Sequence, residues 1–151
     1  MKRIKILFVC TGNTCRSPMA EVILRRKLKN AGIEGVISKS AGLMAEVGTP
    51  MSENSRKALK TLGYRAGKFG ASRVDAKMLR QSDLVVCMSA SHKIPLANFP
   101  NVITVKEITG GTDVIDPYGA DVFTYVKVAC QIEDACNKIL EKIIELKGSE
   151  K

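Results

Sequence analysis

At 151 residues and 16.4 kDa, the chain is long enough for one domain with a sizeable core, and its 45% hydrophobic and 26% charged residues exclude a disordered or fibrous protein. No segment approaches the roughly 20 apolar residues that cross a bilayer, and the apolar run at 6–10 is too short for a signal peptide. The net charge of +9 favours anionic partners, but scattered basic residues and only 5% aromatics argue against a nucleic-acid surface. We therefore expect one cytoplasmic, monomeric domain over residues 1–151, without membrane or nucleic-acid partners.

The first predicted elements are a buried strand and a helix joined by a short loop. Residues 4–9 form an apolar run rich in β-branched side chains, and Gly12 lies in the turn that follows. Ser17 is expected as the N-cap of the next helix, with Pro18 in its first position and 30–32 as its end. A short loop therefore separates the carboxyl end of a strand from the N-terminus of a helix.

The rest of the chain continues this alternation. Further strands are predicted at 36–41, 84–88 and 102–105, a long loop at 106–119, and helices at 52–62, 75–81, 92–99 and 125–146. The last helix carries a continuous apolar stripe. Strands that alternate with helices predict an α/β fold: a single-domain, doubly wound, four-stranded parallel sheet with helices on both faces. Ligands of such folds bind outside the carboxyl ends of the strands.

The loop after the first strand has the form C-x5-R, from Cys10 to Arg16. A loop of this length can wrap an oxyanion with its backbone N–H groups pointing inward, and the helix that follows adds the positive end of its dipole. Gly12 and Asn13 are residue types that tolerate left-handed backbone angles in such a curl. The sequence lacks the Gly-Lys-Ser/Thr of a nucleotide-binding Walker loop. The motif therefore predicts a phosphate site.

The residue types in this loop suit phosphoryl transfer. Cys10 is expected as the nucleophile, because a thiolate at the base of the loop is stabilised by the N–H groups, the helix end and Arg16. Arg16 presents a planar fork to two equatorial phosphate oxygens, and Ser17 offers a hydroxyl to the sulfur. The alternative is that Cys10 is merely a buried strand cysteine. The expected substrate-binding residues in the loop are Thr11, Gly12, Asn13, Thr14, Cys15 and Ser17.

Cysteine and histidine usage argues against a metal site and a disulfide framework. The five cysteines are an odd number without C-x-x-C spacing, and the single histidine, His92, is expected on the surface of a helix. We therefore predict no metal and no other cofactor. Cys15 follows Cys10 closely in the curled loop, so the two thiols could form a reversible disulfide after oxidation. The alternative is that Cys15 only fills space beneath the loop.

Residues 10–21, CTGNTCRSPMAE, closely resemble the signature of the low-molecular-weight protein tyrosine phosphatases. Further matches run along nearly the full chain, at Ser40-Ala41-Gly42, Ser72-Arg73, Asp83-Leu84-Val85-Val86 and Asp116-Pro117-Tyr118-Gly119. The resemblance implies a flavodoxin-like fold, phosphorylated protein substrates, a phosphocysteine intermediate and no metal.

The resemblance also assigns the general acid to Asp116, in an Asp-Pro turn. A carboxylic acid on a loop above the phosphate can protonate the leaving group and then activate water against the intermediate. The alternatives are that Asp116 only begins a turn, or that Asp113 or Asp121 is the acid. Tyr118, close to the acid, is expected at the entrance of the pocket.

Position 14 bears on the substrate. Tyrosine-directed members of the family usually carry a bulky aliphatic residue there, whereas bacterial protein-arginine phosphatases carry threonine, the residue found at Thr14. The segments 104–107 and 113–117 also resemble the arginine-directed branch. We therefore expect a protein-arginine phosphatase, with a protein-tyrosine phosphatase as the alternative.

Two more remote hypotheses compete with a phosphatase. Thioredoxin-coupled arsenate reductases have a similar loop but need two further redox cysteines on a mobile segment. Here Cys87 stands alone, and Cys130 and Cys136 lie on a predicted helix. A non-catalytic phosphate-binding module would keep Arg16 and the loop without requiring the nucleophile or the acid.

Overall fold

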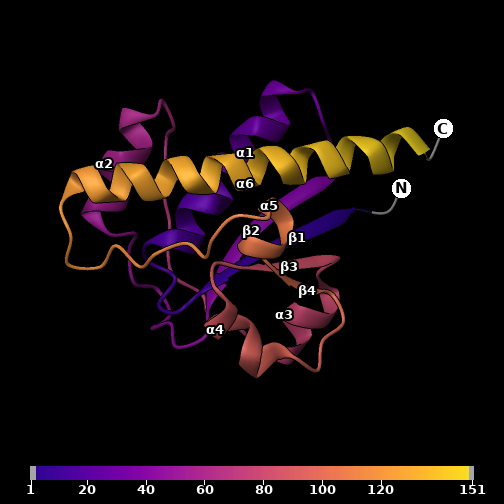
Figure 1. The fold of residues 1–151 in the computed structure, drawn as a ribbon, viewed down its shortest axis with the longest axis horizontal. Helices are drawn as coiled ribbons and strands as arrows, with labels where there is room; N and C mark the ends of the chain where they lie inside the picture. Colours follow the sequence, from indigo (N-terminus) through magenta and orange to yellow (C-terminus); the bar gives the residue numbers. More distant parts are fainter. Residues whose placement is uncertain (1–2, 150–151) are drawn as a thin grey trace.

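The computed structural model describes residues 3–149, in which strands and helices alternate along the chain (Figure 1). In chain order the elements are β1 (Ile4–Cys10), α1 (Arg16–Asn30), β2 (Val36–Gly42), α2 (Glu53–Thr61), α3 (Ala76–Gln81), β3 (Leu84–Cys87), α4 (Ala90–Lys93), the 3-10 helix η1 (Ile94–Leu96), β4 (Val102–Thr104), α5 (Val105–Thr109) and α6 (Val122–Ser149). The four strands pair in parallel, in the order β2-β1-β3-β4. The predicted α/β fold with a four-stranded parallel sheet is confirmed.

Helices cover both faces of the sheet. α1 and α2 pack against α6 on one face, whereas α3 and α4 lie on the other (Figure 1). Side chains of β1 alternate between these faces: Ile6 and Phe8 enter the core beneath α1 and α6, and Leu7 and Val9 enter the smaller core on the opposite side. The same alternation places Cys10 on the face that α1 covers.

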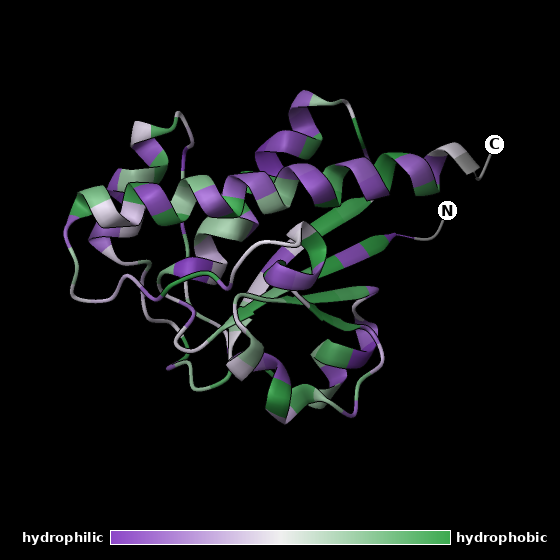
Figure 2. Ribbon diagram, in the orientation of Figure 1, coloured by the Kyte–Doolittle hydropathy of each residue, from purple (hydrophilic) through white to green (hydrophobic). Residues whose placement is uncertain are grey.

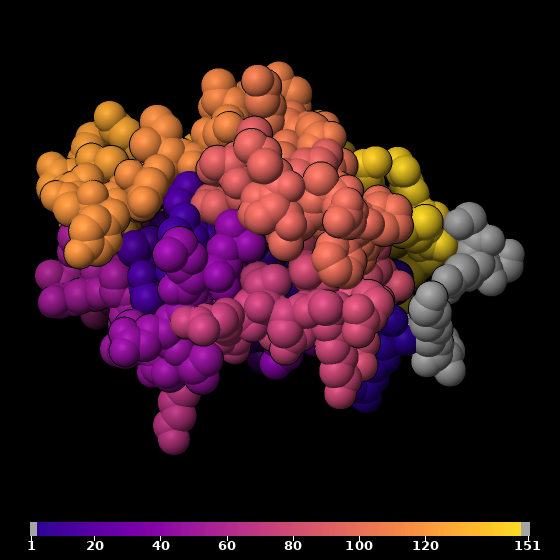
Figure 3. All heavy atoms as spheres, turned by 90° about the horizontal axis from the view of Figure 1, so that it is seen from below, coloured from indigo at the N-terminus to yellow at the C-terminus, as the bar shows by residue number. Residues whose placement is uncertain are grey.

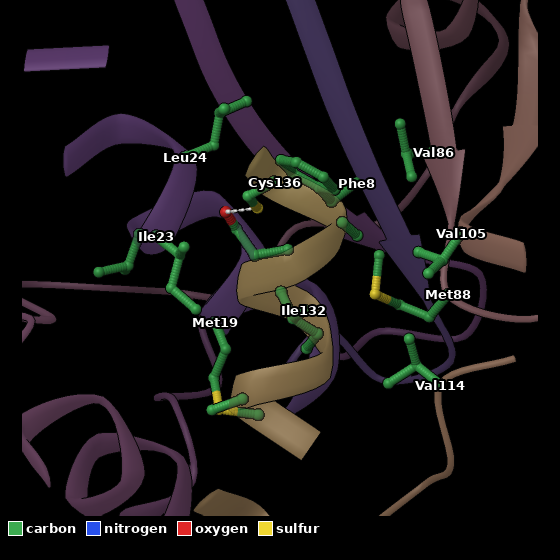
Figure 4. Close-up of a cluster of buried hydrophobic side chains, with 14 of the residues drawn as sticks. Phe8, Met19, Ile23, Leu24, Val86, Met88, Val105, Val114, Ile132 and Cys136 are labelled. Carbon is green, nitrogen blue, oxygen red and sulfur yellow. Dashed lines mark hydrogen bonds between the residues drawn. The ribbon is translucent and has the colours of Figure 1, made fainter. Parts of the chain in front are cut away.

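The larger core forms between α6 and the sheet. Ile132 and Cys136 of α6 lie among Met19 and Ile23 of α1 and Phe8 of β1, and the Cys136 thiol points to a backbone carbonyl of α1 (Figure 4). Figure 2 shows hydrophobic strands and an α6 that alternates between hydrophobic and hydrophilic residues, the amphipathic pattern that the sequence predicts. Within the described part of the chain, none of the helices combines the length and apolarity that a membrane span requires.

One predicted loop contains a helix. The segment 106–119 was expected to be irregular, but α5 occupies its first part and ends at Gly110, which has a positive φ of 75°. The helix forms because Thr104 and Glu107 make a capping box: each side chain accepts a hydrogen bond from the backbone N–H of the other, both at 3.1 Å. The irregular part that positions the predicted acid is therefore shorter than expected.

Candidate active site

The loop between β1 and α1 lies at the carboxyl end of the sheet, where parallel α/β folds bind their ligands. Figure 3 shows indigo atoms from the early part of the chain between an orange and a purple segment. A cavity of about 270 Å³ opens at this loop, and it is lined by Cys10, Thr11, Gly12, Thr14, Cys15, Arg16, Asp116 and Tyr118. Eight of the ten residues that we predicted for the site therefore surround one cavity, and Asn13 and Ser17 lie behind it.

α1 begins closer to Cys10 than the sequence suggested. Cys15, not Ser17, occupies the N-cap position, and Arg16 is the first helical residue. The positive end of the helix dipole therefore lies directly at the loop. Ser17 does not cap the helix; it is buried in the first turn, with its hydroxyl 2.8 Å from the Cys10 sulfur. The predicted contact between this hydroxyl and the thiol is present.

Asn13 holds the loop in its curled shape. Its φ of 56° is the left-handed value predicted for the turn, and its side chain is fully buried. The Asn13 Oδ1 accepts a hydrogen bond from the Ser72 N–H at 2.9 Å, which fixes the orientation of the amide. The Nδ2 group then donates to Ser17 Oγ at 2.8 Å and to Ser40 Oγ at 3.0 Å. Because Ser17 accepts from Asn13, its own proton is free to point at the sulfur of Cys10.

This network continues away from the cavity into α1. The Ser40 hydroxyl, at the end of β2, donates to Glu21 Oε1 at 2.7 Å. Glu21 in turn pairs with Arg25, one turn further along the helix. Residues 10–17, which we call the phosphate loop, are therefore connected by consecutive hydrogen bonds to both β2 and α1.

Two glycines near the loop have different roles. Gly42 leaves no room for a side chain, because a Cβ there would lie 2.6 Å from the Thr11 carbonyl oxygen and 2.8 Å from the Asn13 nitrogen. Gly12 is a residue type that tolerates left-handed angles, but in the structure it does not have a positive φ. A Cβ at Gly12 would meet only Thr14 Oγ1, at 3.8 Å. The absence of a side chain at Gly12 therefore leaves space in the cavity.

Arg16 and Asp116 face each other across the cavity. The Arg16 side chain is almost completely buried, and its Nη1 donates to the Val114 carbonyl at 3.1 Å. The second nitrogen, Nη2, lies 3.7 Å from Asp116 Oδ2. The Asp116 side chain is 55% exposed, and its Oδ1 accepts a hydrogen bond from the Tyr118 N–H at 3.1 Å. Tyr118 itself is 83% exposed at the rim.

The other two candidate acids are placed differently. Asp121 caps α6 by accepting hydrogen bonds from the backbone and hydroxyl of Thr124, both at 2.9 Å, and these bonds lower the pKa of Asp121. Asp113 has a buried Oδ1 without a hydrogen-bond partner among the described residues. Neither residue lines the cavity, whereas Asp116 does. The geometry therefore favours Asp116 as the acid.

The prediction for His92 was wrong: the imidazole is 3% exposed and contacts two residues of the phosphate loop. Its Nε2 is 3.0 Å from Thr11 Oγ1 and 3.5 Å from Arg16 Nη2. Burial, reinforced by the guanidinium of Arg16, lowers the pKa of His92 to about 4. His92 follows β3, whose carboxyl end is beside that of β1, and this position in the predicted topology was the signal that could have revealed it.

Of the other cysteines, Cys15, Cys87 and Cys136 are buried and Cys130 is exposed. Cys15 is buried, with its sulfur 3.5 Å from Ser52 Oγ and 3.6 Å from the Tyr125 hydroxyl, and it is a free thiol like Cys10. Cys87 lies inside the sheet, where burial raises the pKa of its thiol to about 12. A buried thiol with a high pKa is a poor redox centre, so Cys87 does not suit the chemistry of an arsenate reductase.

Known proteins resemble the chain over nearly its whole length. Residues 5–148 match the family model for low molecular weight phosphotyrosine protein phosphatases. A protein-arginine-phosphatase from Geobacillus stearothermophilus is 34% identical, with 92% of this chain and 95% of that protein covered. The low molecular weight protein-tyrosine-phosphatase YfkJ from Bacillus subtilis is also 34% identical, with coverages of 93% and 96%.

The structural comparison adds a phosphorylated relative. A solved structure of a cysteine-to-serine mutant of YwlE arginine phosphatase, with a phosphorylated active-site serine, superposes with a TM-score of 0.85. The two chains are 28% identical, and the alignment covers 93% of this chain and 95% of the other. The fold therefore matches that of an enzyme in which the residue replacing the cysteine carries the phosphate.

Proposed function

The chain belongs to the low molecular weight phosphotyrosine protein phosphatase family, and we propose that within it the protein is a protein-arginine phosphatase. The observation that carries this proposal is Thr14, a hydroxyl-bearing side chain in the wall of the cavity that also contains Cys10, Arg16 and Asp116. These four residues supply a nucleophile, an anion-binding cation, an acid and a polar contact for the leaving group.

In the proposed mechanism Cys10 attacks the phosphorus atom in line with the leaving nitrogen. A sulfur–phosphorus bond forms as the phosphorus–nitrogen bond breaks, and the electron pair of that bond goes to the nitrogen. The Ser17 hydroxyl, 2.8 Å from the sulfur, donates a hydrogen bond to the thiolate. Arg16 binds two equatorial phosphate oxygens and stabilises their negative charge in the transition state.

Asp116 completes both halves of the reaction. In the first it gives its proton to the departing guanidinium nitrogen, and in the second it takes a proton from the water that cleaves phosphocysteine. Its position supports this role, because its Oδ2 is 3.7 Å from Arg16 and its side chain remains half exposed to an incoming substrate. The Tyr118 N–H holds the other carboxylate oxygen, Oδ1, at 3.1 Å.

Thr14 favours a guanidinium over an aromatic ring. Its Oγ1 makes a long contact of 3.7 Å to the Cys15 sulfur, and its backbone carbonyl accepts from the Ser52 N–H at 2.9 Å. The hydroxyl therefore has capacity to accept a hydrogen bond from a guanidinium N–H group. An aliphatic residue at this position would leave such a donor facing an apolar wall, and an unpaired buried donor costs roughly 1–3 kcal/mol.

A protein-tyrosine phosphatase is the second candidate, and Tyr118 is the observation in its favour. Its ring is 83% exposed at the rim of the cavity, where it could stack on a phosphotyrosine ring. The relatives include enzymes named for each substrate at equal identity to this chain. Our further predictions are a cytoplasmic location, a monomeric state, no cofactor and no binding of nucleic acid.

The test compares kcat/KM on two peptides of identical sequence, one carrying phosphoarginine and one phosphotyrosine. We expect the wild type to prefer phosphoarginine, and Thr14→Ile to lower that activity by roughly ten- to a hundredfold while activity on phosphotyrosine holds or rises. Thr61→Ile, on the exposed surface of α2, is the matched control. A wild type that prefers phosphotyrosine, with Thr14→Ile slowing both substrates alike, would remove the arginine assignment and leave only the family.

A further inference from the structure

We propose that His92 is a positioning residue: a neutral imidazole that holds the Thr11 hydroxyl at the mouth of the phosphate loop, where this hydroxyl donates to the bound phosphoryl group. The inference rests on the cavity being a phosphate site, but not on the choice between arginine and tyrosine substrates. It follows from the hydrogen bonds on the two ring nitrogens of His92.

The partners of His92 determine its tautomer. Nδ1 lies 3.2 Å from the backbone nitrogen of Ser89, and a backbone N–H can only donate. The other donor-only group, Arg16 Nη2, makes a longer contact with Nε2, at 3.5 Å, so the shorter bond from Ser89 decides the assignment. We therefore assign Nδ1 as the unprotonated nitrogen and place the single ring proton of the neutral imidazole on Nε2. Nε2 is 3.0 Å from Thr11 Oγ1, so its N–H donates to the threonine oxygen.

The charges around the imidazole keep it in this neutral form. Arg16 Nη2, which is also only a donor, lies 3.5 Å from Nε2, and a second cation there would be repelled. Asp116 and Asp113 act in the opposite direction, but burial and Arg16 dominate and lower the pKa of His92 to about 4. Protonation would also remove the acceptor for Ser89. The donor to Thr11 is therefore fixed across the pH range in which a phosphatase works.

The hydrogen bond from His92 orients the hydroxyl of Thr11, the residue directly after Cys10. Its backbone oxygen accepts from the Met44 N–H at 2.9 Å, and its side chain is exposed in the wall of the cavity. Because the hydroxyl oxygen accepts from His92, the hydroxyl proton remains available to an acceptor in the cavity. A phosphoryl group bound by Arg16 presents such acceptors, so Thr11 becomes a neutral donor beside the cationic one.

Three single variants and one double variant, Thr11→Val with His92→Asn, test this arrangement. The substrate is a generic aryl phosphate, and inorganic phosphate is the inhibitor. Thr11→Val removes the hydroxyl from an exposed position. His92→Asn keeps an acceptor near the Ser89 N–H but is too short to reach Thr11, whereas His92→Gln places an amide donor near the position of Nε2. Thr61→Val, on the surface of α2, is the control, and thermal unfolding shows that each variant is folded.

We expect Thr11→Val and His92→Asn each to lower kcat/KM about tenfold and to weaken phosphate inhibition by a similar factor. The double variant should lose no more than either single one, because both remove the same hydrogen bond. His92→Gln should recover activity to within about threefold of wild type. The proposal is overturned if Thr11→Val leaves kcat/KM and phosphate inhibition within about twofold of wild type, or if the two losses multiply. Thr11→Val alone decides the outcome if a His92 variant does not fold.

Discussion

The two sides of the cavity are held in place by different means. The phosphate loop, residues 10–17, is anchored from behind by Asn13 and Ser17, both completely buried, whose hydrogen bonds lead into β2 and α1. The acid segment, residues 112–118, presents Asp116 with more than half of its side chain exposed and Tyr118 almost fully exposed. The proposed phosphate site is thus built into the core, whereas the proposed acid belongs to a surface segment.

Because of this difference, the two sides of the cavity can contribute differently to a reaction. Donors that the fold has already oriented stabilise a transition state without reorganising, which suits the recognition of a phosphoryl group common to all substrates. In the proposed mechanism, the exposed Asp116 and the exposed ring of Tyr118 face the part of the substrate that varies. We therefore expect changes in the phosphate loop to affect all substrates, and changes in the acid segment to depend on the leaving group.

The largest expected effect is that of Cys10→Ser, which removes the nucleophile but leaves the rest of the phosphate loop. Turnover should fall to the detection limit on every substrate, while inorganic phosphate or vanadate still binds, because Arg16 and the loop remain. Steady-state assays and binding calorimetry check the two halves of this prediction. Retention of more than a few per cent of wild-type activity, as an order-of-magnitude threshold, would end the covalent mechanism.

Next in size is Asp116→Asn, which tests the exposed side of the cavity. We expect kcat/KM, which reports on phosphoryl transfer to Cys10, to fall by roughly 10²–10⁴-fold, the range for a positioned general acid, on substrates with poor leaving groups. The loss should shrink as the leaving group improves, because a good leaving group needs no proton. A series of aryl phosphates of graded acidity provides the measurement, and equal losses across the series would indicate a structural role instead.

Gly42→Ala is expected to displace the phosphate loop without changing any residue that takes part in the reaction. The added Cβ would collide with the Thr11 carbonyl and the Asn13 nitrogen, so the loop has to shift. Misplacing bound groups by a fraction of an ångström should lower kcat/KM by roughly ten- to a hundredfold, on good and poor leaving groups alike. Gly70→Ala is the matched control, because its Cβ would meet Gly48 atoms only at 3.6 Å or more. Losses that depend on the leaving group would contradict the comparison.

The last expected effect is on stability instead of activity, and it comes from His92. The pKa of this group is about 4 when folded and 6.5 when unperturbed, so between these values the unfolded chain binds a proton that the folded chain does not. The free energy of unfolding should therefore rise with pH through this window, by up to roughly 3 kcal/mol, and this contribution should level off above it. Urea denaturation at several pH values, with His92→Gln as comparison, measures the slope; an unchanged slope in the variant would refute this assignment.

The parts that the sequence predicts well are those set by neighbouring residues. Cys10, Asn13 and Arg16 lie within one short segment, and the strand before it and the helix after it determine where its backbone must go. The parallel sheet followed from the alternation of apolar strands with amphipathic helices. Asp116 was different, because its assignment needed the family resemblance: an Asp-Pro turn alone does not show what lies opposite.

The parts that the sequence did not reveal depend on long-range packing. His92 meets Thr11 across 81 positions of sequence, and only the pairing of β1 with β3 brings them together. Gly42 matched the family pattern, but the steric reason for it appears only where β2 passes under the phosphate loop. Ser17 was assigned correctly to the thiol but wrongly to the helix cap, because one hydroxyl cannot serve both positions.

The central claim is that phosphate passes from arginine to Cys10 during turnover, and trapping the intermediate tests it most directly. Wild-type enzyme would be mixed with excess phosphoarginine peptide, quenched within the first turnover under alkaline denaturing conditions, and mapped by mass spectrometry. We predict a phosphoryl group on the peptide that contains Cys10. Product release without any phosphoryl group on Cys10, or a phosphoryl group on another residue, would contradict the account.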